Sequence, residues 1–569
     1  MAAQFDLVVR GGTIADGRGG EPYEGDVAIS GGRIAAVGRV AGSGRDEIDA
    51  RGKLVTPGFV DIHTHYDGQV TWDASLLPSA NHGVTTVVMG NCGVGFAPCR
   101  PQERELLMTL MEEIEDIPLP AMAAGLPWTW ESFPEFLDFL DTQRCDVDFA
   151  TQVPHAALRV YAMGRRGAER EPATAEDIDL MTRVAQEAVE AGALGFSTSR
   201  TMNHRTLAGA LAPTITAGED ELRGITAGLG AIGKGVIQFI DDFHVVSDEG
   251  SPSFAMWRRI VEAAGRPASF TLSQQKADPE RWRSLLALVE RANDDGLTIR
   301  AQISSRAVGS LYSLELSGHP FVRCPAYVAI AKLPLAERVA AMKQPEVCAR
   351  IIAESPDYPM GRGRVIGEMF AFGDPPDYSP PPESRLDKRA AREGTTVLDL
   401  AYDILLEADG HAMLYYPAAN FAYGNLDHTF ELMSHRDTVI GLGDGGAHVA
   451  RTCDSSIPSH VLAYWSRDRK GNRLPVGTAV RLITHDTART VGLGDRGVLA
   501  PGTIGDVNVI DYDRLQMRAP VVQHDLPAGG ARLVQPVDGY VATVKSGTPT
   551  FRDGTSTGAF PGRLVRGSR

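Results

Sequence analysis

The chain has 569 residues, a formal net charge of −16 and 43% hydrophobic residues. This length suggests several domains with large buried cores. The acidic balance, with no basic run to offset it, argues against a nucleic-acid or anionic-membrane partner. The N-terminal sequence shows no secretory signal, and no apolar run reaches the roughly 18 residues of a membrane span. Six cysteines without a CxxC pair are typical of reduced thiols, so we expect a cytoplasmic protein.

The two ends of the chain share a β-rich texture. Short apolar runs alternate with glycine-rich turns in "FDLVVRGGTIADG" and "GDVAISGGRIAAVG" near the N-terminus. The same texture returns in "RGVLAPGTIGDVNVIDYD" and "GYVATVKSGTPTFRDG" near the C-terminus. Strands separated by such turns are typical of a small antiparallel β unit. We therefore predict one β-sandwich domain built from both termini, residues 1–56 and 491–569.

The middle of the chain, residues 57–490, alternates strand and helix patterns. One helix is predicted to begin with a capping box of Thr174 and Asp177 and to end at Gly192. The short buried strand "GFSTS" follows it. The region holds about nine candidate strands, close to the eight of a (β/α)8 barrel. We predict an α/β fold in which this region forms a TIM-type (β/α)8 barrel.

One segment, from about residue 311 to about residue 393, breaks this rhythm. It includes the proline-rich "FGDPPDYSPPPESRLDKRAAREG". Long irregular inserts in compact domains are often lids over active sites. We therefore predict an irregular insert or lid there.

The segment "LVTPGFVDIHTHYDGQV" places two histidines, one residue apart, at the end of an apolar strand. Side chains alternate between the faces of a strand, so Asp61, His63 and His65 share one face. Val60 and Ile62 share the other. Two neutral imidazoles on one strand can bind one metal ion. A histidine-rich loop with satisfied hydrogen bonds would give the same pattern, so the other strand ends must decide.

Further histidine, cysteine and aspartate residues follow other candidate strands. Cys92 follows "GVTTVVMGN", His155 follows "DFATQVP", and Asp444 and His448 follow "DTVIGLG". In a barrel of this type the active site lies at the carboxyl ends of the strands. Taken singly, Cys92 fits a buried thiol, His155 a structural imidazole and Asp444 a turn aspartate. Together with the histidine pair they indicate a metal site.

Six motifs together resemble the amidohydrolase superfamily, and within it the N-acyl-D-amino-acid deacylases, or D-aminoacylases: "GGRIAAVG", "TPGFVDIHTHYDG", "GVTTVVMGNCGVGFAP", "GFSTS", "GDGGAHV" and "RGVLAPGTIGDVNVID". The resemblance covers nearly the whole chain. It implies a (β/α)8 barrel with a small β-sandwich and a divalent metal, usually zinc, at the barrel mouth. His63 and His65 fall on the HxH ligands, and Cys92 on a cysteine that can bridge two metal positions. Asp444 falls on an aspartate that binds metal and shuttles the proton.

The chain departs from this family pattern at the tighter metal position. Where relatives have a metal-binding histidine in an SHxK motif, this chain has "LSQQK" with Gln274, and an amide is a poor zinc ligand. The segment "IRAQISSR", where the next histidine is expected, contains none. We therefore predict one or two divalent ions, Zn²⁺, with one favoured. His204, His244 and His319 are candidate replacement ligands.

These residues predict a metal-dependent hydrolase of an acyl amide carbon–nitrogen bond, resembling an N-acyl-D-amino-acid deacylase. Asp444 is expected to accept a proton from a metal-activated water. Two alternatives stay open. One is a hydrolase of the same superfamily that acts on a cyclic amide, lactone or ester. The other is a non-catalytic relative that acts as a binding or assembly module.

The predicted substrate-binding residues are Arg451, His155 and His448. Arginine matches a carboxylate with two parallel hydrogen bonds, and Arg451 lies in the loop that follows the predicted catalytic aspartate. Arg200 and Arg205 compete for this role. We expect a small-molecule acyl-amide substrate as the partner, with neither nucleic acid nor membrane, and a homo-oligomer is compatible with the sequence.

Overall fold

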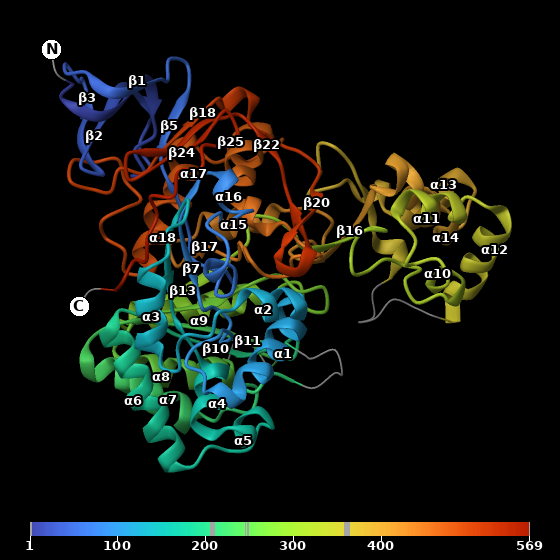
Figure 1. Cartoon of the computed structure of the whole chain (residues 1–569), viewed down its shortest axis with the longest axis horizontal. Helices are drawn as coiled ribbons and strands as arrows, with labels where there is room; N and C mark the ends of the chain where they lie inside the picture. Colours follow the sequence, from blue (N-terminus) through green and yellow to red (C-terminus); the bar gives the residue numbers. More distant parts are fainter. Residues whose placement is uncertain (1–2, 205–210, 245, 247–249, 358–364, 568–569) are drawn as a thin grey trace.

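The structure is a computed structural model that describes residues 3–204, 211–244, 246, 250–357 and 365–567. It is an α/β protein in which helices pack around parallel sheets. Figure 1 shows a large body and a smaller lobe, drawn in yellow, at one side of it. Among the described helices, none combines the length and the apolar character that a membrane crossing requires.

Both ends of the chain contribute to one nine-stranded sheet. Its central link is the antiparallel pairing of β5 (Leu54–Pro57) with β18 (Val507–Ile510). A buried cluster that includes Val55 and Val509 covers one face of this sheet. The pairing fixes β5 just before the strand that leads to the histidine pair. The other strands of the sheet are β1 (Phe5–Ile14), β2 (Tyr23–Ser30), β3 (Arg33–Gly38), β4 (Gly44–Asp49), β23 (Tyr540–Lys545), β24 (Thr548–Arg552) and β25 (Thr555–Ser556).

The middle of the chain forms a three-stranded and a six-stranded parallel sheet whose strand order follows the chain. Only Gln152 separates the last strand of the first from the first strand of the second. A parallel bridge joins Thr64, just after β6, to Gly445, just after β17. The carboxyl ends of β6, β7 and β17 therefore lie side by side. The strands are β6 (Phe59–Asp61), β7 (Val84–Met89), β8 (Asp148–Thr151), β9 (Val153–Pro154), β10 (Gly195–Arg200), β11 (Val236–Asp241), β12 (Ala268–Thr271), β13 (Ile299–Ile303) and β17 (Thr438–Ile440).

Helices connect these strands and cover them. The predicted capping box is confirmed, because Thr174 and Asp177 bond reciprocally at the start of α6 and Gly192 caps its end. The predicted strand "GFSTS" is confirmed as the buried β10. The helices of the body include α1 (Arg104–Glu115), α2 (Leu119–Gly125), α3 (Phe133–Asp141), α4 (His155–Met163), α5 (Arg165–Ala168), α6 (Ala175–Ala191), α7 (Glu219–Ile232), α8 (Pro252–Ala264), α9 (Arg281–Asp294), α15 (Asp427–Met433), α16 (Ile457–His460), α17 (Val476–Leu482) and α18 (His485–Thr490).

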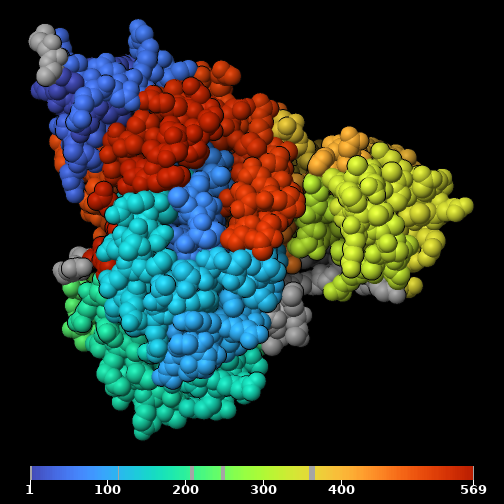
Figure 2. Space-filling view, viewed as in Figure 1, coloured from blue at the N-terminus to red at the C-terminus, as the bar shows by residue number. Residues whose placement is uncertain are grey.

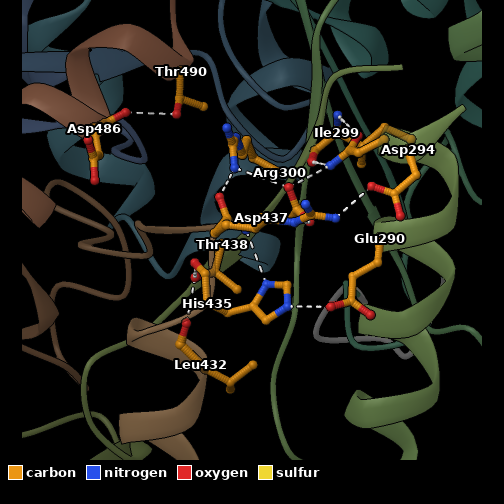
Figure 3. Close-up of polar contacts among 12 residues, drawn as sticks. Glu290, Asp294, Ile299, Arg300, Leu432, His435, Asp437, Thr438, Asp486 and Thr490 are labelled. Atoms are coloured by element: carbon orange, nitrogen blue, oxygen red, sulfur yellow. Dashed lines mark hydrogen bonds and ion pairs between the residues drawn. The ribbon is translucent and has the colours of Figure 1, made fainter. Parts of the chain in front are cut away.

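A polar network ties the amino ends of β13 and β17 to α9 (Figure 3). Asp437, just before β17, accepts a hydrogen bond from Asn293 of α9 at 3.0 Å and pairs with Arg300 of β13 at 3.3 Å. His435 lies 2.7 Å from Glu290 of α9. The network lies at the amino ends of the strands, opposite the end where the histidine pair is found. It therefore anchors the sheet and is remote from the predicted site.

The segment predicted to be irregular is largely helical, and it forms the lobe that projects from the body in Figures 1 and 2. Its helices pack around a buried apolar cluster of their own, which includes Phe321 and Tyr402. The proline-rich stretch gave no clear helical pattern in the sequence. Short helices of this kind are stabilised mainly by partner helices that cover their apolar faces, and those partners are known only from the structure. The elements of the lobe are β14 (Val308–Tyr312), α10 (Pro325–Val328), α11 (Leu335–Met342), α12 (Pro345–Glu354), β15 (Phe370–Phe372), α13 (Leu386–Glu393), α14 (Val397–Leu406) and β16 (Met413–Ala419).

Candidate metal centre

The structure brings His63, His65 and Cys92 into one buried group. One ligand atom from each lies within 4.8 Å of the others. His63 Nε2 lies 3.1 Å from Cys92 Sγ. The two histidines follow β6 and the cysteine follows β7, and these strands are parallel neighbours. The convergence therefore follows from the topology of the sheet.

Asp444 reaches the same group from the loop after β17. Its Oδ1 lies 3.6 Å from His63 Nε2 and 4.0 Å from His65 Nε2. The Asp444 backbone N–H donates to the His63 carbonyl oxygen at 2.9 Å, and the His65 N–H donates to the Gly445 carbonyl oxygen at 2.7 Å. The Asp444 side chain is 22% exposed, whereas the two histidines are 1% exposed. The aspartate is therefore the member of the group that solvent can reach.

The loop around Asp444 requires glycine at two positions. A Cβ at Gly443 would lie 2.1 Å from Asp61 Oδ2, and a Cβ at Gly446 would lie 2.7 Å from the His65 carbonyl oxygen. Asp444 itself has a φ of 45° and Cys92 a φ of 58°. Such angles cost a non-glycine residue about 1–3 kcal/mol each and are concentrated at functional sites.

A glutamine of β13 determines the tautomer of His63. Gln302 Oε1 lies 2.8 Å from His63 Nδ1, and the Gln302 amide nitrogen donates to Ser269 Oγ at 2.9 Å. An amide oxygen can only accept, so Nδ1 carries the proton and Nε2 keeps its lone pair toward Cys92 and Asp444. Burial lowers the pKa of His63 to about 4, against the opposing effect of the Gln302 hydrogen bond. The imidazole is therefore neutral at neutral pH, as a metal ligand must be.

A carboxylate that the sequence analysis did not single out lies beside this group. Glu115 ends α1 and is 1% exposed. Its Oε1 lies 3.7 Å from His65 Nδ1, and its Oε2 lies 3.6 Å from His448 Nε2. Within the described part of the chain, Glu115 Oε1 and His65 Nδ1 have no hydrogen-bond partner. The sequence signal was "MEEIED", which places acidic residues at the carboxyl end of a helix, where they oppose the helix dipole.

The chemistry of these residues fits a zinc-like divalent ion. Imidazole, thiolate and carboxylate are the ligand types that zinc prefers. Burial, with neighbouring carboxylates as the next cause, raises the pKa of Glu115 and of Asp444 well above the usual range. Burial likewise raises the pKa of the Cys92 thiol. A cation among them would stabilise the ionised forms of all three groups.

His155, predicted to bind substrate, lies outside the group. Its Nδ1 lies 2.8 Å from Thr198 Oγ1 and its Nε2 lies 2.9 Å from Glu221 Oε1. Glu221 also pairs with Arg159. Because β9 ends at Pro154 and α4 begins at His155, the ring enters a buried ion-pair network.

His448 and Arg451 lie at the edge of the group, beside the carboxyl end of α1. The His448 side chain is 33% exposed and faces Glu115. Arg451 Nε lies 3.0 Å from Asp116 Oδ2, and its side chain is 27% exposed. The arginine expected to recognise a substrate anion therefore already pairs with a carboxylate of the protein.

The competing arginines are placed differently. Arg200 Nη1 donates to the Ala217 carbonyl oxygen at 2.8 Å, and Arg200 Nε lies 3.6 Å from Asp241 Oδ2. Arg205 lies outside the described residues. Arg200 is therefore held by the segment before α7 and by the last residue of the neighbouring strand, β11.

Of the three candidate replacement ligands, His204 alone is found with the group in the described structure. A ligand atom of His204 lies within 4.8 Å of atoms of Cys92 and Glu115. His244 is instead 70% exposed, 3.4 Å from Asp242. The expectation that His319 lies near the site is corrected, because its ring is buried in the lobe, 4.4 Å from the ring of Tyr327.

Gln274 stands where the family pattern has a metal-binding histidine, but its side chain is hydrogen-bonded to another segment of the chain. The Gln274 Oε1 accepts a hydrogen bond from the Ala422 backbone N–H at 2.9 Å. The Gln274 backbone N–H donates to Asn420 Oδ1 at 2.7 Å. The side chain thus holds the segment after β16.

The chain matches the amidohydrolase family over residues 46–551. N-acyl-D-aspartate deacylase of Alcaligenes xylosoxydans xylosoxydans is 37% identical over 516 residues, which cover 90% of this chain and 86% of that protein. D-aminoacylase of the same organism is 27% identical over 570 residues, 99% of this chain and 97% of that protein.

Solved structures agree in fold. A crystal structure of D-aminoacylase is 25% identical, with a TM-score of 0.63, and the match covers 99% of this chain and 100% of that one. N-acyl-D-glutamate deacylase from Bordetella bronchiseptica, complexed with zinc and a phosphonate inhibitor, is 24% identical with a TM-score of 0.64, and the match covers 99% of each chain.

Fold, site and relatives together define a hydrolase of carbon–nitrogen bonds other than peptide bonds. The chain belongs to the amidohydrolase family. The resemblance to N-acyl-D-amino-acid deacylases that its motifs predicted is confirmed.

Proposed function

We propose that this protein hydrolyses the acyl amide bond of an N-acyl-D-amino acid, with a zinc ion held by His63, His65, Cys92 and Asp444. The observation that carries the proposal is the convergence of the first three ligand atoms within 4.8 Å, with the Asp444 carboxylate beside them. The 37% identity to an N-acyl-D-aspartate deacylase supports a D-configured substrate. The zinc in the N-acyl-D-glutamate deacylase structure supports the metal.

We infer that the parallel strands close into a (β/α)8 barrel, in which β8 and β9 act as one strand. The bridge between Thr64 and Gly445 supports this closure. We also propose that residues 1–56 and 491–569 form a β-sandwich domain and that the barrel spans residues 57–490, with the lobe as its insert. The shared sheet of the two chain ends supports this division.

In this mechanism the residues of the chain hold the reactants and move a proton. When bound, the divalent ion lowers the pKa of a water molecule and polarises the scissile carbonyl. Asp444, at the solvent-exposed side of the group, accepts the proton of the attacking water and returns it to the departing amine. Gln302 keeps Nε2 of His63 unprotonated. The roles proposed for His448 and Arg451 are contacts with the substrate, at the edge of the group.

We also propose a cytoplasmic location and a small-molecule partner. All six cysteines are free thiols, as in a reducing compartment. The net charge of −16 makes an anionic polymer an unfavourable partner.

The test is a substrate panel with the full-length protein, after zinc loading and after chelation. The panel holds N-acetyl amino acids of both configurations, with acidic and neutral side chains, and a cyclic amide, a lactone and an ester. Release of D-amino acids that needs zinc and is lost in His63→Asn would support the proposal. Turnover of only the cyclic amide, lactone or ester would favour the first alternative. Zinc binding without any turnover would favour a binding module.

A further inference from the structure

We propose that Gln238 is a further catalytic residue, whose side-chain amide donates a hydrogen bond to the oxygen of the scissile carbonyl. That oxygen gains negative charge as water adds to the carbonyl carbon, and a fixed donor stabilises the charge. Gln238 lies on β11 and is 1% exposed. The inference rests on the proposed function and adds a residue to its mechanism.

The amide group of Gln238 lies directly beside a proposed metal ligand. Its Oε1 accepts a hydrogen bond from the Cys92 backbone N–H at 3.1 Å. The Cys92 sulfur in turn lies 3.1 Å from His63 Nε2. Since the nitrogen and the oxygen of an amide are bonded to the same carbon, Nε2 is held next to the same loop. A substrate carbonyl that approaches these ligands therefore comes close to this amide.

The hydrogen bond from Cys92 also determines the orientation of the amide. A backbone N–H can only donate, so the atom that faces it is the carbonyl oxygen of Gln238. Nε2 is the remaining atom, and it carries two N–H donors. It is buried and has no hydrogen-bond partner among the described residues. Buried polar side chains are normally hydrogen-bonded, and a substrate oxygen would supply the missing acceptor.

The side chains beside Gln238 hold other parts of the site. Gln238 is in register with Ser197 of β10 and with Ser269 of β12. Ser197 Oγ accepts the Gly93 backbone N–H at 3.1 Å, and Ser269 Oγ accepts the Gln302 side-chain N–H at 2.9 Å. In the described part of the chain neither serine bonds to Nε2 of Gln238, so this donor stays available to a ligand.

Other candidates for the same role are held elsewhere. Both ring nitrogens of His155 are bonded to other side chains. Gln274 also has a buried Nε2 without a described partner, but its Oε1 is held by the Ala422 N–H, in the segment after β16. Gln238 differs from both, because its amide contacts the backbone of the proposed ligand Cys92 directly.

The experiment compares two substitutions of Gln238 in the full-length, zinc-loaded protein. Gln238→Glu keeps an oxygen for the Cys92 N–H and removes the donor, because a neighbouring cation keeps the carboxylate ionised. Gln238→Met removes both the oxygen and the donor. Gln102→Glu adds the same charge at an exposed position and is the control. Thermal melts and zinc content establish that each variant is folded and loaded.

We expect both substitutions of Gln238 to lower kcat by about 10²–10³ on the substrate that wild type turns over fastest, with KM changed by less than about threefold. Calorimetry measures binding of the phosphonate analogue of that substrate. Its affinity should fall by a similar factor, because its charged tetrahedral group resembles the transition state. The control should match wild type in all three measurements.

A folded, zinc-loaded variant of either kind with wild-type kcat and phosphonate affinity would overturn the inference. If that variant is Gln238→Glu, the amide only supports the Cys92 loop. Loss of zinc from Gln238→Glu would also overturn it, since the amide would then act on the metal. If Gln238→Met does not fold, Gln238→Glu decides. In each of these cases wild type still releases D-amino acid with zinc, whereas failure of the proposed function would abolish that release in wild type itself.

Discussion

The hydrogen bond between Gln302 and His63 can be tested by removing its acceptor. Gln302 is 1% exposed and its Oε1 lies 2.8 Å from His63 Nδ1. Gln302→Leu keeps a side chain of similar size without an acceptor. Gln302→Glu keeps an oxygen at the same place. We expect the leucine variant to weaken zinc binding, and the glutamate variant to retain it.

The size of the effect follows from the role of the bond. Removing the outer partner of a metal-binding histidine typically weakens metal affinity by about 10–100-fold. At about 1.4 kcal/mol per tenfold change, this is roughly 1.4–2.8 kcal/mol of binding free energy. The leucine variant also leaves the His63 Nδ1–H buried without a partner, which lowers the free energy of unfolding by about 1–3 kcal/mol.

Zinc affinity is measured by competition with a chromophoric chelator, and the free energy of unfolding by denaturant titration of the metal-free protein. The two readouts separate a metal-specific effect from a general loss of packing. A leucine variant with wild-type zinc affinity would refute the assigned tautomer of His63. Equal losses of affinity in the leucine and glutamate variants would show that Gln302 only fills space.

Three further perturbations have defined outcomes. Asp444→Asn should lower kcat by about 10²–10⁴, because an amide cannot accept the water proton; steady-state kinetics that show most of the turnover retained would exclude Asp444 as the base. Arg451→Ala should raise KM for acidic substrates and spare a neutral analogue, whereas equal losses would mean that its pair with Asp116 only supports α1. Burial lowers the pKa of His82 to about 3, so the unfolded chain takes up that proton first as pH falls through about 6.5. Proton uptake by the unfolded chain alone lowers the free energy of unfolding by about 2 kcal/mol as the pH falls from about 7.5 to about 5. In denaturant titrations across that range, His82→Asn should remove this loss, and the exposed control His524→Asn should not.

Local pattern in the sequence was enough to predict which residues gather around the histidine pair. Strand alternation predicted that His63 and His65 share one face. Their positions after other strands predicted that Cys92 and Asp444 lie at the same end of the sheet. Parallel strands bring their carboxyl ends to a common edge, so residues at these positions meet whatever the details of the helices. The capping box at Thr174 was readable for a similar reason, since its hydrogen bonds span only three residues.

Tertiary structure alone decided which further residues surround that group. Glu115 ends a helix and His204 lies in a loop, and no periodicity relates either to the histidine pair. Their positions depend on contacts distant in sequence, such as the hydrogen bond from the His448 N–H to the Glu115 carbonyl oxygen. His155 follows a strand as the predicted ligands do. Its ring nonetheless bonds to Glu221, because α4 begins at His155. Strand ends are specified by local pattern, whereas side chains on loops and helix ends are specified by the partners that packing supplies.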